Sequence, residues 1–414
     1  MQYNWKKNTG AFLASQAISI LGSSLVQYAM LWHITLTTKS GIFATLSIIC
    51  GFLPTLFLSP FAGVWADRYD RKKLIMLADG GIALVTLALA IVFSVGYTAT
   101  WTLLAAMALR AFGTAVQNPC VNAMLPSIVP KEELTRVNGI YNSLNSIIFI
   151  ASPVLSGALM AFAPLQVIFY IDVITAALSS VVLLLFRRLP EREGSEGEAG
   201  NGNYFQGMKE GFAYIKNQRY LMHFFGFCIA FFFLASPLVN LTPLQVTRNY
   251  GDNAQMLAGI EVAFSVGMLA GGLLLTVWPG LKNRTHTLAL SSFFLALGTV
   301  ALGLPISFAV YVVVMGLLGF VLTYFNTPAI VLLQERVEPA FMGRVFVVMT
   351  MLSSSVMPLA MLLFGPLAYR LSIDVLLFAT GAALFLVAFG LMRNKPLLEA
   401  GKPLAVESRD LSAN

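Results

Sequence analysis

Twelve stretches of mainly apolar residues dominate this sequence of 414 residues, and each is about as long as a lipid bilayer is thick. A helix needs about 20 apolar residues to cross the hydrocarbon core, whereas a barrel strand needs only about ten, with alternating polarity. The runs lie near residues 10–36, 41–66, 74–95, 99–123, 138–161, 166–186, 220–245, 254–278, 286–305, 307–332, 345–368 and 374–392. We therefore predict an all-α membrane protein with twelve transmembrane helices, arranged as two pseudo-symmetric six-helix bundles.

The composition agrees with a chain whose solvent is largely lipid. Hydrophobic residues make up 57% and charged residues only 11%, whereas a soluble domain has about 25% charged residues. The net charge of +7 does not indicate nucleic-acid binding, because the basic residues fall in short loops. The three cysteines are far apart in apolar runs, so we expect neither a disulfide framework nor a metal site.

Basic residues fix the predicted orientation. With the N-terminus inside, 22 of the 26 Lys and Arg residues fall in cytoplasmic segments and only three in outer loops. Lys and Arg near span ends resist translocation, so both termini are expected in the cytoplasm. The first apolar run is too long for a signal-peptide core of about 7–15 residues, and we interpret it as a retained helix.

The longest polar stretch lies near the middle of the chain and separates two groups of six spans. Its acidic, Gly-rich part, residues 191–203, is typical of a flexible linker. Apolar residues at helical spacing in 204–216 predict an amphipathic helix at the inner membrane surface. The predicted domains are an N-terminal bundle at 1–187, a linker at 188–219, a C-terminal bundle at 220–392 and a cytoplasmic tail at 393–414.

Weak internal similarity suggests that the two halves arose by duplication. The pattern Val64-Trp65 with Arg71 recurs as Val277-Trp278 with Arg284, an offset of 213 residues. Two copies with the same membrane orientation form the parallel repeat of a two-bundle transporter, in which the substrate site lies near mid-membrane between the bundles.

A charged turn between the second and third spans carries the most specific motif. Gly63, Asp67, Arg68, Arg71 and Lys72 match the spacing Gly-x-x-x-Asp-Arg-x-Gly-Arg-Lys/Arg. This turn resembles the loop signature of the major facilitator superfamily, and Gly63 is expected to let a neighbouring helix approach closely. Asp70 stands where the signature has glycine, so the geometry of the turn is open.

The resemblance implies that this turn forms a gate. Asp67 would meet the N-terminus of the helix that begins near Arg344, where backbone N–H groups favour an anion. Such a contact would hold the two bundles together on the inside. The alternative is that the loop only determines membrane topology.

Ionisable residues inside spans are costly and indicate function. The clearest cases are Arg110, Asp172 and Glu261, whereas Asp79 lies one turn from the inner face and could reach the interface. Glu261 and Asp172 are proton-coupling candidates, because burial away from water favours the protonated form of a carboxylate. Arg110 would then act as a fixed charge beside them. Alternatively, Arg110 pairs permanently with one acid and only holds the bundle together.

Polar residues along the expected cavity helices are candidates for substrate contact. They are Gln16, Gln27, Asn142, Asn145, Asn240 and Asn326. A small-xxx-small motif, Gly267 to Gly271, is expected to pack helices together. Phosphate-binding loops and zinc-binding His and Cys motifs are absent from the sequence, so we expect no enzyme and no cofactor, with the proton gradient as energy source.

Further segments resemble the macrolide-efflux (Mef-type) members of the drug:proton antiporter group. They include Ser15-Gln16-Ala17-Ile18-Ser19 and Arg110-Ala111-Phe112-Gly113-Thr114-Ala115. The resemblance implies a multidrug efflux protein of the bacterial inner membrane, which exports amphipathic drug-like molecules such as macrolides in exchange for protons and confers antibiotic resistance. Its expected partners are a small amphipathic substrate, protons and lipid, and a monomer is the expected form. A siderophore or metabolite exporter, a lysolipid flippase and a non-transporting sensor or scaffold are the alternatives.

Overall fold

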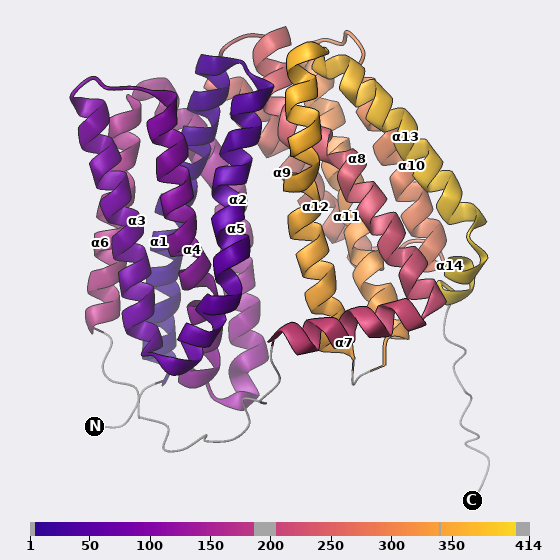
Figure 1. Ribbon diagram of the computed structural model, residues 1–414, viewed down its shortest axis with the longest axis horizontal. Helices are drawn as coiled ribbons and strands as arrows, with labels where there is room; N and C mark the ends of the chain where they lie inside the picture. The colour runs from indigo at the N-terminus through magenta and orange to yellow at the C-terminus, as the bar shows by residue number, and fades with distance from the viewer. Residues whose placement is uncertain (1–4, 186–203, 339–340, 403–414) are drawn as a thin grey trace, which may run out of the picture. The chain divides into compact units, whose positions relative to one another are not determined.

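The computed structural model describes residues 5–185, 204–338 and 341–402, and the regular elements in these ranges are all helices (Figure 1). The predicted all-α class is therefore confirmed. The linker segment at 191–203, the end of the C-terminal tail and the side chain of Asp67 lie outside what the structure describes.

Six long helices form in the first half, at the positions that the apolar runs predict. They are α1 (Trp5–Thr38), α2 (Gly41–Arg68), α3 (Arg71–Ser94), α4 (Thr100–Ile128), α5 (Leu134–Phe162) and α6 (Leu165–Leu185), with a short 3₁₀ helix η1 (Lys131–Glu133) before α5.

The second half contains six further long helices and two shorter ones. They are α7 (Tyr204–Asn217), α8 (Arg219–Asn249), α9 (Ala254–Val277), α10 (Arg284–Leu302), α11 (Phe308–Arg336), α12 (Met342–Arg370), α13 (Ile373–Arg393) and α14 (Lys395–Ala400). The short connection expected before α11 is present, and the Ser307 hydroxyl accepts a hydrogen bond from the backbone N–H of Val310 as an N-cap. The helix α14 was not predicted, because it lies in the segment that we interpreted as a tail.

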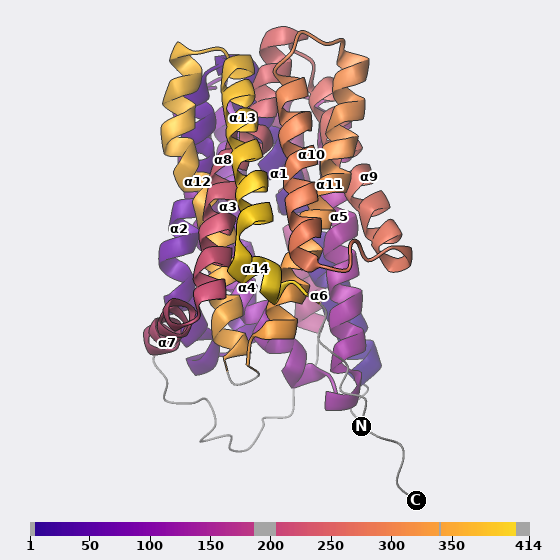
Figure 2. The same ribbon diagram turned by 90° about the vertical axis from the view of Figure 1, so that its right-hand side faces the viewer.

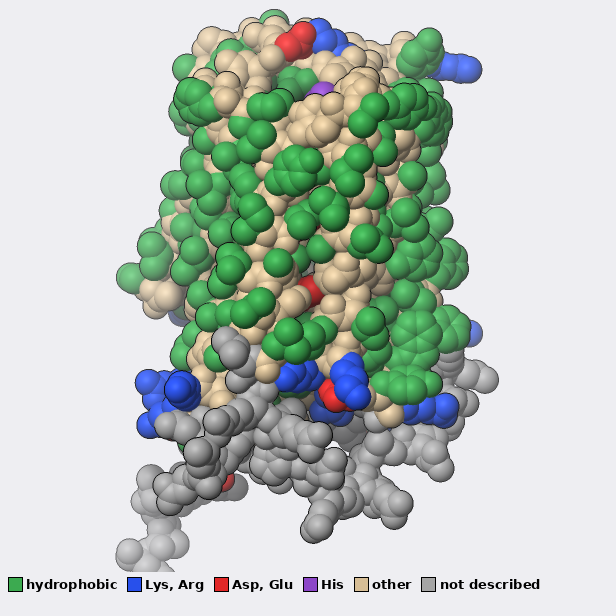
Figure 3. Space-filling model, turned by 90° about the vertical axis from the view of Figure 1, so that its left-hand side faces the viewer, with side chains coloured by type: hydrophobic (Ala, Val, Ile, Leu, Met, Phe, Trp, Pro, Cys, Tyr) green, Lys and Arg blue, Asp and Glu red, His purple; other side chains and the backbone are tan. Residues whose placement is uncertain are grey.

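Eleven of the described helices are long and apolar enough to cross a membrane. The remaining long helix, α4, has 29 residues but carries Arg110, Gln117 and Asn118, which lower its hydropathy. Figure 3 shows hydrophobic side chains along one face, with Lys and Arg mostly toward its ends. A surface that faces lipid is expected to carry apolar side chains along its middle and charged ones near its ends, because lipid replaces water around its middle.

Backbone contacts divide the chain into two compact units. The first unit consists of Met1–Asn201, Asn240–Val262 and Met361–Ser372. The second unit consists of Gly202–Val239, Ala263–Ala360 and Ile373–Asn414. The first unit thus contains α1 to α6 and also the ends of α8, α9 and α12. The domain boundaries predicted from the sequence stay a prediction.

Helix pairs of the two units correspond to each other. In the first unit, α3 packs against α4 and α6. In the second unit, α10 packs against α11 and α13, which are the equivalent helices of the second half. The expected packing role of the small-residue motif is confirmed, because a Cβ on Gly267 would lie only 1.8 Å from the carbonyl oxygen of Gly316 on α11.

The amphipathic helix predicted at 204–216 is present as α7 and lies crosswise to the long helices of the second unit (Figures 1 and 2). Within the second unit it contacts the start of α12. Tyr214 stacks on Phe341 with a centroid distance of 4.3 Å, and Glu210 forms an ion pair with Arg344 at 3.0 Å. These contacts hold α7 against the start of α12, and its location at the inner membrane surface stays a prediction.

Candidate functional site

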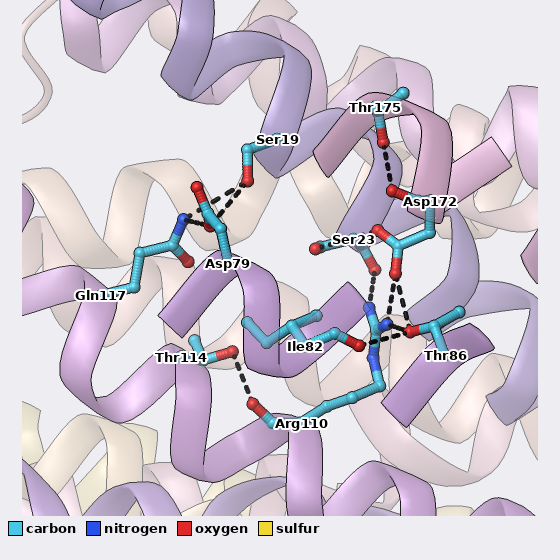
Figure 4. A network of polar contacts seen from close by, with 10 residues as sticks. All are labelled: Ser19, Ser23, Asp79, Ile82, Thr86, Arg110, Thr114, Gln117, Asp172 and Thr175. Carbon is cyan, nitrogen blue, oxygen red and sulfur yellow. Dashed lines mark hydrogen bonds and ion pairs between the residues drawn. The ribbon is translucent and has the colours of Figure 1, made fainter. Parts of the chain in front are cut away.

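A buried ion pair between Arg110 and Asp172 lies at the centre of the first unit (Figure 4). Arg110 comes from α4 and is 4% exposed, and Asp172 comes from α6 and is 1% exposed. Arg110 Nη1 also donates to the hydroxyl of Thr86 on α3, and Nη2 donates to the carbonyl oxygen of Ser23 on α1 at 3.2 Å. Four helices therefore meet at this one guanidinium.

Asp172 receives further hydrogen bonds. The Ser23 hydroxyl donates to Oδ1 at 3.2 Å, and the Thr86 hydroxyl lies 2.9 Å from Oδ2. Close packing of α1 on α6 brings these groups together, since a Cβ on Gly22 would lie 1.9 Å from Thr175 Oγ1. The sequence left the partner of Arg110 open, and the structure identifies it as Asp172. Removing one member of such a pair leaves a buried charge without compensation.

A second buried carboxylate, Asp79 on α3, lies near this pair. It is 2% exposed, and its Oδ1 accepts hydrogen bonds from Ser19 on α1 at 3.0 Å and from Gln117 Nε2 on α4 at 2.6 Å. The alternative that Asp79 simply reaches out to the interface does not hold, because α1 and α4 enclose its side chain. The signal available in the sequence was that Asp79 and Gln117 both lie within apolar helices.

A polar cavity of about 430 Å³ opens beside the network in the first unit. Its walls come from α1, α2, α4 and α5. The charged side chain among the lining residues is Arg110, and its charge is neutralised by Asp172. Most polar side chains at the wall are uncharged hydroxyls and carboxamides, which form hydrogen bonds without selecting for charge. They are Ser23, Ser24, Gln27, Thr55, Thr114, Gln117, Asn118, Tyr141 and Asn145.

Two of the six predicted substrate contacts, Gln27 and Asn145, line this cavity. Gln16 is instead buried, and its amide lies 3.5 Å from the Ser15 hydroxyl. Asn142, also on α5, is exposed and does not line this cavity. Asn240 on α8 and Asn326 on α11 are half-buried and do not line this cavity.

Glu261 lies on α9, in the part of that helix that belongs to the first unit. The side chain of Tyr28 on α1 lies within electrostatic range of its carboxylate. Within the described ranges, Glu261 forms no ion pair, and Arg110 is bound elsewhere. Of the three ionisable candidates, Arg110 and Asp172 therefore form an ion pair, and Glu261 is a separate carboxylate.

The charged turn between α2 and α3 is ordered by two of its residues. Asp70 is the N-cap of α3, and its Oδ1 accepts from the backbone N–H groups of Lys72 at 3.0 Å and Lys73 at 3.3 Å. This turn does not need the glycine of the signature, since Asp70 has a φ of −60°. Arg71 donates to the carbonyl oxygens of Ala66 at 2.9 Å and Ala123 at 2.8 Å, which ties α2 to α4.

The close helix approach expected at Gly63 does not occur within the first unit. A Cβ on Gly63 would meet no atom of that unit within 4 Å. Arg68 is exposed and Lys72 is half-buried. Arg344, the expected neighbour of Asp67, is paired with Glu210 of α7.

The profile of the Major Facilitator Superfamily matches residues 10–361 of this chain. The chain is 30% identical over 387 residues to Macrolide efflux protein A of Streptococcus pyogenes, which covers 93% of this chain and 95% of that protein. It is 32% identical over 315 residues to Macrolide efflux protein A of Enterococcus faecalis, which covers 76% of this chain and 96% of that protein.

A solved structure resembles the fold along nearly the whole chain. It is a bacterial homologue of the human lysosomal transporter Spinster, in an inward-facing and unoccupied conformation. The TM-score is 0.67 with 15% sequence identity, and the match covers 98% of this chain and 100% of the other. At this level of identity the likeness concerns the fold alone.

Proposed function

This chain belongs to the major facilitator superfamily, and on that premise we propose that it is a proton-coupled exporter of amphipathic drug-like molecules. It is a multi-pass membrane protein and a transporter of small substrates. The proposal adds the direction of transport, the class of substrate and the source of energy. Macrolides are the first substrates to test, because two macrolide efflux proteins are similar over most of this chain.

The observation that carries the proposal is the polar cavity beside the Arg110–Asp172 pair. Transporters place their substrate site near mid-membrane, where polar groups would otherwise be unfavourable. Here the cavity wall is rich in uncharged hydroxyl and carboxamide groups, and Gln27 and Asn145 face it from two helices. Such a wall suits a neutral or weakly basic molecule that carries several hydroxyl groups.

Energy coupling is assigned to the buried carboxylates. Glu261 has no cation as partner in the described part of the chain, so it is the first candidate to bind and release a proton. Arg110, paired with Asp172, would act on the nearby carboxylates through its charge. We assign the Asp67 turn to gating between inward-open and outward-open states, with both termini in the cytoplasm and the inner membrane as the location.

The proposal is tested in a bacterial host that lacks its own drug exporters. Cells that express the protein should accumulate less labelled erythromycin than cells with an empty vector, and an uncoupler should abolish the difference. A panel that also contains siderophores and peptide antibiotics compares the alternative substrates. Cells that express Arg110→Gln at the same level are the matched control.

Equal accumulation of every panel compound in expressing and control cells would contradict export. Reduced accumulation that survives the uncoupler would instead contradict the proton gradient as the energy source. Neither result depends on which residue binds the proton.

A further inference from the structure

Asp79 is a buried carboxylate whose charge nothing around it neutralises. Its Oδ1 accepts two hydrogen bonds, from Ser19 and Gln117. Its Oδ2 makes no hydrogen bond of ordinary length in the described part of the chain, and the neutral hydroxyl of Ser179 on α6 is the further group close enough to act on this carboxylate as a donor. An ionised carboxylate away from water is unfavourable unless a cation or several hydrogen bonds compensate it.

The helices packed around Asp79 provide no cation that pairs with its carboxylate in the described part of the chain. From α1 it meets Ser19 and from α4 it meets Gln117, both neutral. The charged group that acts on it from α6 is Asp172, which is also negative. Arg110 is the nearby cation on α4, and its guanidinium is bound to Asp172. Among α1, α3, α4 and α6, the carboxylates of Asp79 and Asp172 therefore share a single guanidinium, that of Arg110.

Gln117 connects Asp79 to the cavity. The carboxamide of Gln117 lines the cavity wall and donates to Asp79 Oδ1 at 2.6 Å. Figure 4 shows one group around Asp79 and a neighbouring group around the Arg110–Asp172 pair, and α1, α3 and α4 contribute side chains to both. A change at the cavity that moves Gln117 would therefore change the surroundings of the Asp79 carboxylate.

We propose that Asp79 is a proton-binding site of the transport cycle, in addition to Glu261, and that it exchanges its proton through the cavity that Gln117 lines. One proton binds to Oδ2 and converts the carboxylate into a neutral carboxylic acid, and the same proton leaves when the cavity opens to the other side. This inference rests on the proposed proton-coupled transport.

A purely structural role for Asp79 makes a different prediction. As a hydrogen-bond acceptor for Ser19 and Gln117, Asp79 can be replaced by Asn, which keeps an acceptor oxygen at the same place. As a proton-binding site, Asp79 cannot be replaced by Asn, because a carboxamide does not titrate. Asp79→Asn and Asp79→Glu therefore separate the two roles.

The first experiment needs no substrate. Infrared difference spectra of the purified protein, recorded from acid to alkaline pH, detect the carbonyl stretch of a protonated buried carboxyl group. We expect one titrating component to be lost in Asp79→Asn and to be present in Asp79→Glu. The same titrating components in wild type and Asp79→Asn would overturn the inference. If Asp79→Asn does not accumulate, Ser19→Ala decides, because losing a donor to Oδ1 must move the midpoint of that component, and an unmoved midpoint contradicts the proposal.

The second experiment uses proteoliposomes and labelled erythromycin. Asp79→Asn should lose export driven by a pH gradient and keep gradient-independent exchange. Gradient-driven export at the wild-type rate in Asp79→Asn would contradict the inference. If wild type shows no gradient-driven export, the proposed function fails, and the infrared titration still decides whether Asp79 binds a proton.

Discussion

Arg248 holds the turn at Lys39 by donating two hydrogen bonds to its backbone carbonyl oxygen, at 3.1 Å from Nε and 2.7 Å from Nη2. A third bond runs from Nη1 to the carbonyl oxygen of Ala368 at 2.8 Å. The Lys39 backbone is left-handed, with a φ of +48°, and its amine meets Asp252 at 2.5 Å. One guanidinium thus joins the α1–α2 turn to the ends of α8 and α12 within the first unit.

Arg248→Lys should loosen the contact of the α1–α2 turn with the ends of α8 and α12. A lysine ammonium cannot reproduce the planar fork that binds two carbonyl groups at once, and each charge-assisted hydrogen bond is worth about 1.5–3 kcal/mol. We expect a cysteine placed at Thr45, on the neighbouring part of α2, to react faster with a membrane-impermeant maleimide. Arg370→Lys is the control, because Arg370 is exposed at the same end of α12. An unchanged labelling rate in Arg248→Lys would contradict a locking role.

Gly365→Val should block transport by preventing contact between α2 and α12. A Cβ on Gly365 would lie 1.6 Å from Thr45 Oγ1, and one on Gly41 would lie 2.5 Å from the Gly365 carbonyl oxygen. The helices can approach this closely only without side chains. Gly272→Val is the control, since a Cβ there meets nothing within 4 Å. The rate of erythromycin efflux is measured for both variants. A normal rate in Gly365→Val would show that transport does not need the contact between α2 and α12.

Arg110→Leu or Asp172→Leu alone should destabilise the protein more than the two changes together. Removing one partner of a buried ion pair costs about 3–5 kcal/mol, whereas replacing both by apolar residues is often neutral. Thermal unfolding in detergent is the measurement, with the double variant melting closer to wild type than either single variant. Transport should stay lost in the double variant, because Arg110 lines the cavity. Additive losses of stability would argue against a mutual pair.

Gln27→Leu and Asn145→Leu should weaken substrate affinity. Each would lose a hydrogen bond worth about 1 kcal/mol, which corresponds to roughly a fivefold rise in KM. Asn142→Leu is the matched control on the same helix as Asn145, because Asn142 is exposed and does not line the cavity. Initial rates of erythromycin transport in vesicles measure the effect. Equal KM values for Asn145→Leu and Asn142→Leu would place the substrate elsewhere.

Glu261→Gln should abolish pH-driven transport while the protein stays folded. The carboxamide keeps the size and polarity of the side chain, so packing on α9 is preserved and only protonation is removed. Drug uptake driven by protons into inverted vesicles is the measurement. Because Tyr28 lies in electrostatic range of Glu261, Tyr28→Phe is a useful control that keeps the carboxylate. Undiminished proton-driven uptake by Glu261→Gln would exclude Glu261 as the coupling residue.

The internal repeat shows how far local pattern reaches. Arg71 and Arg284 match at an offset of 213 residues in the sequence, and the structure gives both the same place at the start of a helix. Each donates to a carbonyl oxygen five residues earlier, at Ala66 and Pro279 respectively. Each also reaches the helix that follows its own, Arg71 at Ala123 and Arg284 at Glu335. The motif predicted the place of these residues, but not their partners.

The sequence by itself determined the helices and the class of protein. Long apolar runs must form helices in lipid, because every backbone group needs a partner there, and the boundaries follow from where the runs stop. Local capping belongs to the same level, as at Asp70, whose carboxylate accepts from residues two and three positions later. Such features depend only on residues that are close along the chain.

Only the tertiary structure decided which polar groups meet inside the bundle. The partner of Arg110 is 62 residues away at Asp172, and Gln117 lies against Asp79 from a different helix. The residues of one helix do not decide which of its sides will face the interior of the bundle. The rotation and depth of each helix are therefore set only when the helices pack. For that reason Asp79 looked interfacial in the sequence and is buried in the fold.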